Sequence, residues 1–185
     1  MLKTYITTVP LQGKLDPMLY QRERAGAPTA TCFPIVQVMR DTLEPGDTVQ
    51  LLAIRQENAD TARNYQRLLE ELAQLGIAED QVHQLHLPED QRPETLIGLC
   101  RDLVDALPQV TRVYACITYG SKSIPVVTLT APVALSMARE CASLSPGLVP
   151  FTAAASAGVF TPLAALRHIQ HPGRNLIPQP GGVGE

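Results

Sequence analysis

Residues 112–123 read RVYACITYGSKS, and this stretch decides the fold. Arg112–Thr118 is rich in β-branched and aromatic residues, which is typical of a buried strand. Gly120 and its polar neighbours end that pattern, and Pro125 stands where the first turn of a helix would begin. A strand that runs through a short loop into a helix is the repeating unit of α/β proteins.

Three more strands and helices precede this unit. The expected strands are Tyr5–Val9, Thr48–Ile54 and Gln81–Leu87. The expected helices are Phe33–Leu43, Thr61–Leu75 closed by Gly76, and a segment that begins at Pro93. Because strands and helices alternate, the chain is predicted to form a Rossmann-like, mainly parallel sheet with helices on both faces.

The chain of 185 residues is long enough for one well-buried core. We expect a single ligand-binding domain over residues 1–170, with further short elements near 147–155 and 158–163. Residues 171–185 are rich in Gly and Pro and lack periodicity, which predicts a linker or a disordered tail. This suggests a domain that is, or once was, joined to another part of a longer protein.

Composition excludes several function classes. The net charge of −3 and the lack of a basic block argue against coating duplex nucleic acid. The first residues lack a signal peptide and no apolar run could cross a bilayer, so we expect a cytoplasmic protein with no membrane partner.

Metal and cofactor motifs are missing from the sequence. The four cysteines form no C-x-x-C pair, and we interpret them as small buried side chains in a reducing compartment. His83 and His86 fall on a strand at odd spacing, so they point to opposite faces. There is no G-x-G-x-x-G after the first strand and no P-loop, so we expect neither a cofactor nor a metal.

Polar residues follow three of the four expected strands. In open parallel sheets, ligands bind beyond the carboxyl ends of the strands, where helix N-termini point outward. The candidate ligand-binding residues are Thr7, Thr8, Val9, Pro10, Gln12 and Gly13 after the first strand, Arg55 and Asn58 after the second, and Thr118, Tyr119, Gly120, Ser121, Lys122 and Ser123 after the fourth.

Thr118–Ser123, here called the lysine loop, carries most of this prediction. Gly120 permits close backbone approach, and Ser121 and Ser123 can cap the next helix or donate hydrogen bonds. Lys122 adds positive charge at a helix N-terminus, and Tyr119 could stack on a base. An ordinary strand-to-helix turn with a serine cap is the alternative, just as Asn58 alone fits a simple helix cap.

Four stretches resemble the CRISPR-associated Rossmann-fold (CARF) domains, which recognise cyclic oligoadenylates. Ile6–Pro17 is similar to the family's first strand and its binding loop before Asp-Pro, and Phe33–Val49 to its first helix and second strand. Ile117–Pro125 resembles its most recognisable motif, a strand that ends in Thr-Gly-Gly-Thr-Lys or similar residues. Val159–Leu163 is similar to a late strand.

The resemblance implies a two-fold homodimer with a cyclic oligoadenylate, cyclic tetra-adenylate favoured, across the dimer axis. Lys122 and the amides near Gly120 and Ser121 would hold phosphates. Thr7, Thr8 and Gln12 would contact ribose or base, and Asn58 would complete the base pocket. The chain would then act in type III CRISPR antiviral signalling and control an effector, which a C-terminal effector domain could supply.

Two alternatives stay open. A standalone, metal-independent ring nuclease would cleave the ring slowly, with Lys122 stabilising the developing charge and Thr8 or Thr7 orienting the ribose 2′-hydroxyl. A Rossmann-like interaction module without a nucleotide ligand belongs to a different class altogether.

Overall fold

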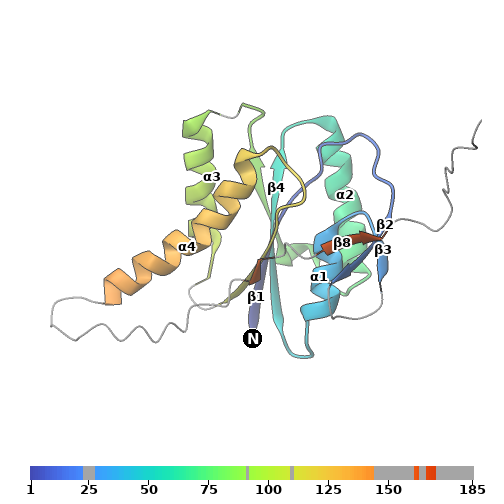
Figure 1. The fold of residues 1–185 in the computed structure, drawn as a ribbon, viewed down its shortest axis with the longest axis horizontal. Coiled ribbons are helices and arrows are strands. Elements are labelled where there is room, and N and C mark those ends of the chain that lie inside the picture. The colour runs from blue at the N-terminus through green and yellow to red at the C-terminus, as the bar shows by residue number, and fades with distance from the viewer. Residues whose placement is uncertain (23–27, 91, 109–110, 144–160, 163–165, 170–185) are drawn as a thin grey trace, which may run out of the picture.

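The computed structural model describes residues 1–22, 28–90, 92–108, 111–143, 161–162 and 166–169 (Figure 1). Its main sheet has the order β5-β4-β1-β6-β7, and all neighbouring strands are parallel. These strands are β1 (Leu2–Thr8), β4 (Thr48–Gln56), β5 (Val82–Leu87), β6 (Arg112–Cys116) and β7 (Thr161–Pro162). The helices are α1 (Pro34–Thr42), α2 (Ala59–Ala73), α3 (Pro93–Ala106) and α4 (Ser123–Ser143), with a 3-10 turn at Glu79–Gln81.

The four predicted strands and four predicted helices are confirmed, and with them the Rossmann-like α/β fold. In Figure 1, α1 and α2 lie on one side of the sheet and α3 and α4 on the other. Successive strand residues alternate between the two sides, because strand side chains have a period of two. Tyr5 and Leu51 pack with α1 and α2, whereas their neighbours Ile6 and Leu52 pack with α3 and α4.

The segment between β1 and α1 differs from the sequence prediction. No strand was predicted between residues 9 and 33, but this segment contains β2 (Met18–Arg22) and β3 (Thr29–Thr31), which pair antiparallel. A third strand, β8 (Leu166–Ile169), pairs antiparallel with β2. Pro17 and Pro28 favour loop structure, and the two strands are too short to show a clear alternation, so the sequence pattern hid them.

The observed ends of strands and helices also differ from the predicted ends by a few residues. β4 extends through Gln56, so Arg55 belongs to the strand instead of the following loop. Gly76, with φ of 76°, ends α2 as predicted. The Ile77 N–H donates to the Leu72 carbonyl at 3.1 Å and the Gly76 N–H to Ala73 at 3.0 Å, the Schellman pattern that a left-handed residue permits.

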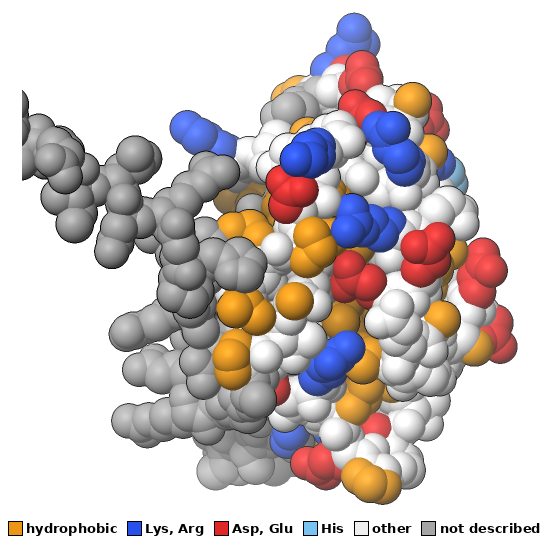
Figure 2. Space-filling view, turned by 90° about the vertical axis from the view of Figure 1, so that its right-hand side faces the viewer, with side chains coloured by type: hydrophobic (Ala, Val, Ile, Leu, Met, Phe, Trp, Pro, Cys, Tyr) orange, Lys and Arg blue, Asp and Glu red, His pale blue; other side chains and the backbone are white. Residues whose placement is uncertain are grey.

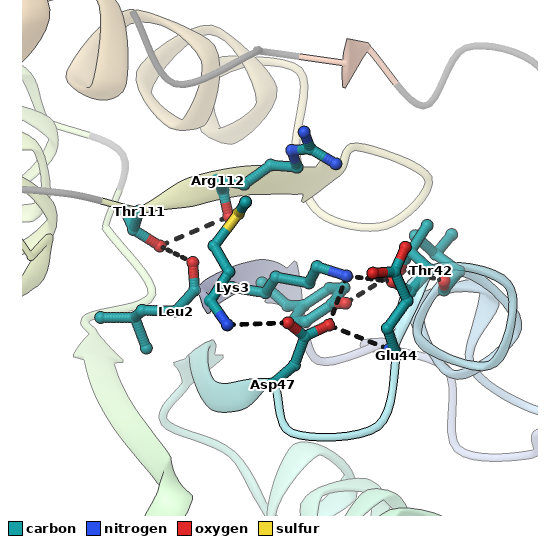
Figure 3. Close-up of polar contacts among 10 residues, drawn as sticks. Leu2, Lys3, Thr42, Glu44, Asp47, Thr111 and Arg112 are labelled. Carbon is teal, nitrogen blue, oxygen red and sulfur yellow. Dashed lines mark hydrogen bonds and ion pairs between the residues drawn. The ribbon is translucent and has the colours of Figure 1, made fainter. Parts of the chain in front are cut away.

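A buried lysine fixes the amino end of the sheet (Figure 3). The Lys3 side chain is 2% exposed, and its ammonium lies 2.5 Å from the Asp47 carboxylate and donates to the Thr42 carbonyl. Asp47 also accepts hydrogen bonds from the amino terminus at 3.0 Å and from the Glu44 N–H at 2.9 Å. The hydrogen bond from Lys3 holds the pKa of Asp47 well below its usual range, and those from the amino terminus and Glu44 add to this effect.

The expected strand at 147–155 and the expected tail at 171–185 lie outside the described residues. Among the helices described, none is both long and apolar enough to cross a membrane. Cys32 and Cys116 are buried free thiols, as expected, while Cys100 is partly buried.

Candidate functional site

The carboxyl ends of β4, β1 and β6 lie side by side. β1 is the middle strand of the three, with Thr8 opposite Ile54 of β4 and Thr7 opposite Cys116 of β6. The Val9 N–H donates to the Ile54 carbonyl at 2.8 Å, which extends this edge by one residue. The strand order therefore places the first-strand residues next to the lysine loop, as the sequence predicted.

Gly120 brings the lysine loop onto the end of β1. Its backbone φ is 103°, an angle that residues other than glycine rarely adopt. A Cβ at this position would lie 3.1 Å from the Thr8 methyl group and 3.2 Å from the Ile124 side chain. The loop therefore depends on glycine both for its backbone angle and for its close contact with Thr8.

Lys122 lies on the exposed side of the loop, directly before α4. The Ile124 N–H donates to the Ser121 carbonyl at 3.1 Å, and the Ser121 and Ser123 hydroxyls are 3.1 Å apart. Over the described part of the chain, Lys122 is exposed and forms no ion pair. An unpaired ammonium beside the positive end of a helix dipole favours an anion.

Tyr119 turns to the opposite side of the sheet from Gly120. Its hydroxyl donates to the Cys32 carbonyl at 3.2 Å, just before α1. Burial raises the pKa of Tyr119 well above its usual range, and hydrogen bonding with Tyr20 raises it further. The phenol therefore keeps its proton, and its hydroxyl fastens the loop to the β2–β3 side of the molecule.

Cys116 and the two threonines of β1 form the floor below the loop. Burial raises the pKa of the Cys116 thiol, and hydrogen bonds with Thr118 and Thr7 partly offset this effect. The thiol donates to the Thr118 hydroxyl at 3.4 Å, while Thr118 itself is exposed. Thr7 and Thr8 are only 2% and 3% exposed, so they support this edge from below and offer little surface to a ligand above it.

The segment after β1 is attached to α2. Val9 and Pro10 are buried, whereas Gln12 and Gly13 are exposed. The Asn64 side-chain amide donates to the carbonyls of Pro10 at 2.8 Å and Gln12 at 2.9 Å. The Gln12 side chain and the Gly13 backbone are thereby presented to solvent from a fixed loop.

Arg55 and Asn58 have partners of their own. The Gln84 side-chain amide lies 2.9 Å from Nε of Arg55, an arrangement in which the amide oxygen accepts the hydrogen bond. Asn58 caps α2: its side-chain oxygen accepts from the Thr61 N–H at 2.8 Å, and the Thr61 hydroxyl accepts from the Asn58 N–H. Both residues are half-buried, and these contacts tie them to β5 and α2.

Sequence reasoning missed the three residues that support the site. Tyr20 and Cys32 hold Tyr119, and Asn64 holds the loop after β1. Each acts across a long sequence separation, and no local pattern marks it. No cluster of three or more His, Cys, Asp or Glu side chains suited to a metal occurs among the residues that the structure describes.

No protein-family model and no curated protein matches the chain, so the fold and the geometry of this edge are what bear on function.

Proposed function

We propose that the chain is a CARF-like sensor domain that binds a cyclic oligoadenylate, with cyclic tetra-adenylate as the favoured ring. In this role it would act as a homodimer in type III CRISPR antiviral signalling and control an effector. The observation that carries the proposal is the exposed Lys122, which lies directly before α4 and forms no ion pair with any residue that the structure describes, next to a glycine that lies against the end of β1.

The chemistry of this edge suits a compact polyanion. Lys122, the serine hydroxyls and the start of α4 offer donors and positive charge to a phosphate. The exposed Gln12 and Gly13 lie after the neighbouring strand, within the segment expected to contact ribose or base. Net charge is slightly negative, so attraction would be confined to this edge.

The protonation of Tyr119 and Cys116 and the burial of Thr8 favour a binding role over cleavage of the ring. The pKa values of Tyr119 and Cys116 are raised, so both keep their protons and neither is a general base near neutral pH. Thr8, the candidate for orienting a 2′-hydroxyl, is almost fully buried and turns its methyl group toward Gly120. Lys122 is therefore proposed as a binding residue.

Isothermal titration calorimetry with cyclic tetra-adenylate tests the proposal. Lys122→Ala should weaken binding about 10- to 100-fold, the usual loss for a hydrogen bond to a charged group. Arg101→Ala is the matched control, because Arg101 is an exposed cation on α3, away from the lysine loop. The Arg101→Ala variant should bind cyclic tetra-adenylate with the affinity of the wild type.

Two further readouts separate the alternatives. Wild-type affinity should fall with added salt and Lys122→Ala should flatten that dependence, because phosphate contacts release counterions. Labelled ring that stays intact during long incubation with stoichiometric protein supports sensing, whereas cleaved ring would establish a nuclease. No binding of rings of any size would overturn the proposal in favour of an interaction module.

A further inference from the structure

The short strands β2, β3 and β8 form a second sheet with the order β3-β2-β8, here called the small sheet. Tyr20 lies on its central strand, β2. The small sheet packs beside α1, away from α3 and α4 (Figure 1). None of its three strands pairs with a described strand of the main sheet. Its connection to the lysine loop therefore depends on contacts outside the two sheets.

The small sheet is fastened to α2 where β3 ends. The Glu71 carboxylate of α2 accepts hydrogen bonds from the Thr31 hydroxyl and, at 3.0 Å, from the Cys32 N–H. Just before β2, the Arg67 guanidinium of α2 donates to the Leu15 carbonyl at 2.8 Å. Thr31 and Cys32 are buried, so water competes little for these hydrogen bonds and the end of β3 is held firmly in place.

Cys32 connects this anchored strand end to the lysine loop. Its N–H is held by Glu71, and its carbonyl accepts the hydrogen bond from the Tyr119 hydroxyl at 3.2 Å. The Tyr119 hydroxyl is also hydrogen-bonded with Tyr20 of β2. Two partners from the same side of the molecule therefore fix one hydroxyl, and with it the direction of the Tyr119 ring. Hydrogen bonds of this kind, one step away from a ligand, hold a binding site in its productive geometry.

Tyr119 directly precedes Gly120, the residue at which the loop turns toward Lys122. Glycine has more backbone freedom than any other residue, so a loop that turns at a glycine needs contacts on both sides to keep one conformation. On the α4 side, the Ile124 N–H donates to the Ser121 carbonyl at 3.1 Å. On the other side is the Tyr119 hydroxyl. The order of the loop therefore depends on the small sheet as well as on α4.

We infer that Tyr119 is a positioning residue, through which the small sheet controls how tightly the lysine loop holds its ligand. The inference rests on the proposed function, because it concerns the anion that Lys122 is proposed to bind. A loop that is already ordered loses less conformational entropy when a ligand binds, so an anchored loop binds more tightly.

The surface charge on this side of the molecule favours an indirect role for the small sheet. Basic and acidic side chains are spread over the side that carries α2 (Figure 2). Over the described part of this face, charge of one sign does not gather, so the face is not suited to attract an anion itself. The small sheet would therefore act on binding through Tyr119 and not by contact with the ligand.

Limited proteolysis with trypsin, in the absence of any ligand, tests the anchor. Trypsin cuts after Lys122 when the loop opens, so the rate of this cut reports the open fraction. Tyr119→Phe keeps the ring and removes the hydroxyl, and it should speed the cut after Lys122 about 10-fold. The cut after Arg63, measured in the same digest, requires α2 to open and should change less than about two-fold.

Tyr5→Phe is the matched control. It removes a buried tyrosine hydroxyl that is hydrogen-bonded with Thr42 at 2.8 Å, but at the other end of β1. The cut after Lys122 should keep its wild-type rate in this variant. An unchanged rate in Tyr119→Phe, or an equal acceleration in Tyr5→Phe, would overturn the inference.

Tyr20→Phe tests the link to the small sheet. It leaves the hydrogen bond from Tyr119 to Cys32 in place, so it should speed the cut after Lys122 by less than Tyr119→Phe does. In the Tyr119→Phe background it should add nothing, because both changes act on the same hydroxyl. If Tyr119→Phe also opens α2, the milder Tyr20→Phe decides, and a cut after Lys122 at the wild-type rate would then contradict the inference.

Calorimetry with cyclic tetra-adenylate measures the effect on binding. Tyr119→Phe should weaken binding about 5- to 10-fold, whereas Tyr5→Phe should bind like the wild type. Wild-type affinity in a Tyr119→Phe chain whose loop opens faster would overturn the control of binding by the small sheet. A wild type that binds no ring would instead overturn the proposed function and leave the digestion result standing, so the two failures are distinguishable.

Discussion

The two ends of the central strand hold two lysine environments that contrast sharply. At the amino end, Lys3 is buried and its charge is neutralised by Asp47, with the Thr42 carbonyl as a second partner. At the carboxyl end, Lys122 is exposed, and no described acidic group pairs with it. A paired, buried charge holds a fold together, whereas an unpaired, exposed one is available to a ligand.

The contrast extends to the surrounding groups. At the amino end, the Tyr5 hydroxyl is 2.8 Å from that of Thr42, and the Tyr5 ring stacks on Tyr114 with centroids 5.0 Å apart. At the carboxyl end, the contacts that hold the lysine loop include the close approach of Gly120 to Thr8, the hydrogen bond from Tyr119 to the Cys32 carbonyl and the one from Cys116 to Thr118. Stability should therefore depend more on the first end and binding more on the second.

The largest expected effect is at the amino end. Lys3→Met should lower the thermal unfolding midpoint by roughly 10 °C, because it leaves a buried carboxylate without its main partner. Lys14→Met is the control: Lys14 and Asp16 form an ion pair at 3.3 Å but are 85% and 71% exposed, so the loss should stay below about 1 kcal/mol. Equal losses in the two variants would remove the distinction between the buried and exposed pairs.

Acid should reduce the stability that Asp47 contributes at the amino end of the sheet. The pKa of Asp47 is depressed in the folded chain, so the unfolded chain binds more protons once the pH falls below about 4. The stability that Asp47 contributes is therefore present above that pH and is lost as the pH falls further. Urea unfolding across this range should show a steeper decline for the wild type than for Asp47→Asn, and parallel curves would contradict the assignment.

A smaller effect is expected at the carboxyl end. Gly120→Ala should cost about 1–2 kcal/mol, from the left-handed backbone angle and the close approach to Thr8. Chemical denaturation would measure it. Gly46→Ala measures the cost of the left-handed backbone angle alone, since Gly46 has φ of 87° and no neighbouring atom within 4 Å of the added Cβ. Gly120→Ala should therefore lose more than Gly46→Ala, and it should also weaken ring binding.

Local patterns were enough to predict the main sheet. Thr48–Ile54 is apolar enough to identify a buried strand, and Pro93 and Gly76 mark helix ends by the backbone angles that they impose or allow. The lysine loop was identified in the same way, from a strand, a glycine and a helix in succession. Parallel strands then bring their carboxyl ends together, which is why the order of elements placed Thr7 and Thr8 on the same edge as the lysine loop.

Side-chain partners between distant segments could not be read from the sequence. The hydroxyl of Tyr119 donates to the carbonyl of Cys32, 87 positions away, and no local pattern marks that partner. The pairing of Lys3 with Asp47 is equally remote from any local pattern. The β2–β3 hairpin escaped detection because short strands next to prolines do not alternate for long enough.

The central place of β1 also bears on how the chain reaches its fold. β1 precedes the other strands of the main sheet in the sequence, yet its neighbours are β4 and β6, with Leu2 opposite Thr48 and Lys3 opposite Arg112. One edge of β1 stays unpaired until β6 has been synthesised, because no nearer strand of the main sheet can take that position. Pairings this distant are slow to form, so we expect the edge between β1 and β6, and with it the lysine loop, to assemble late in folding.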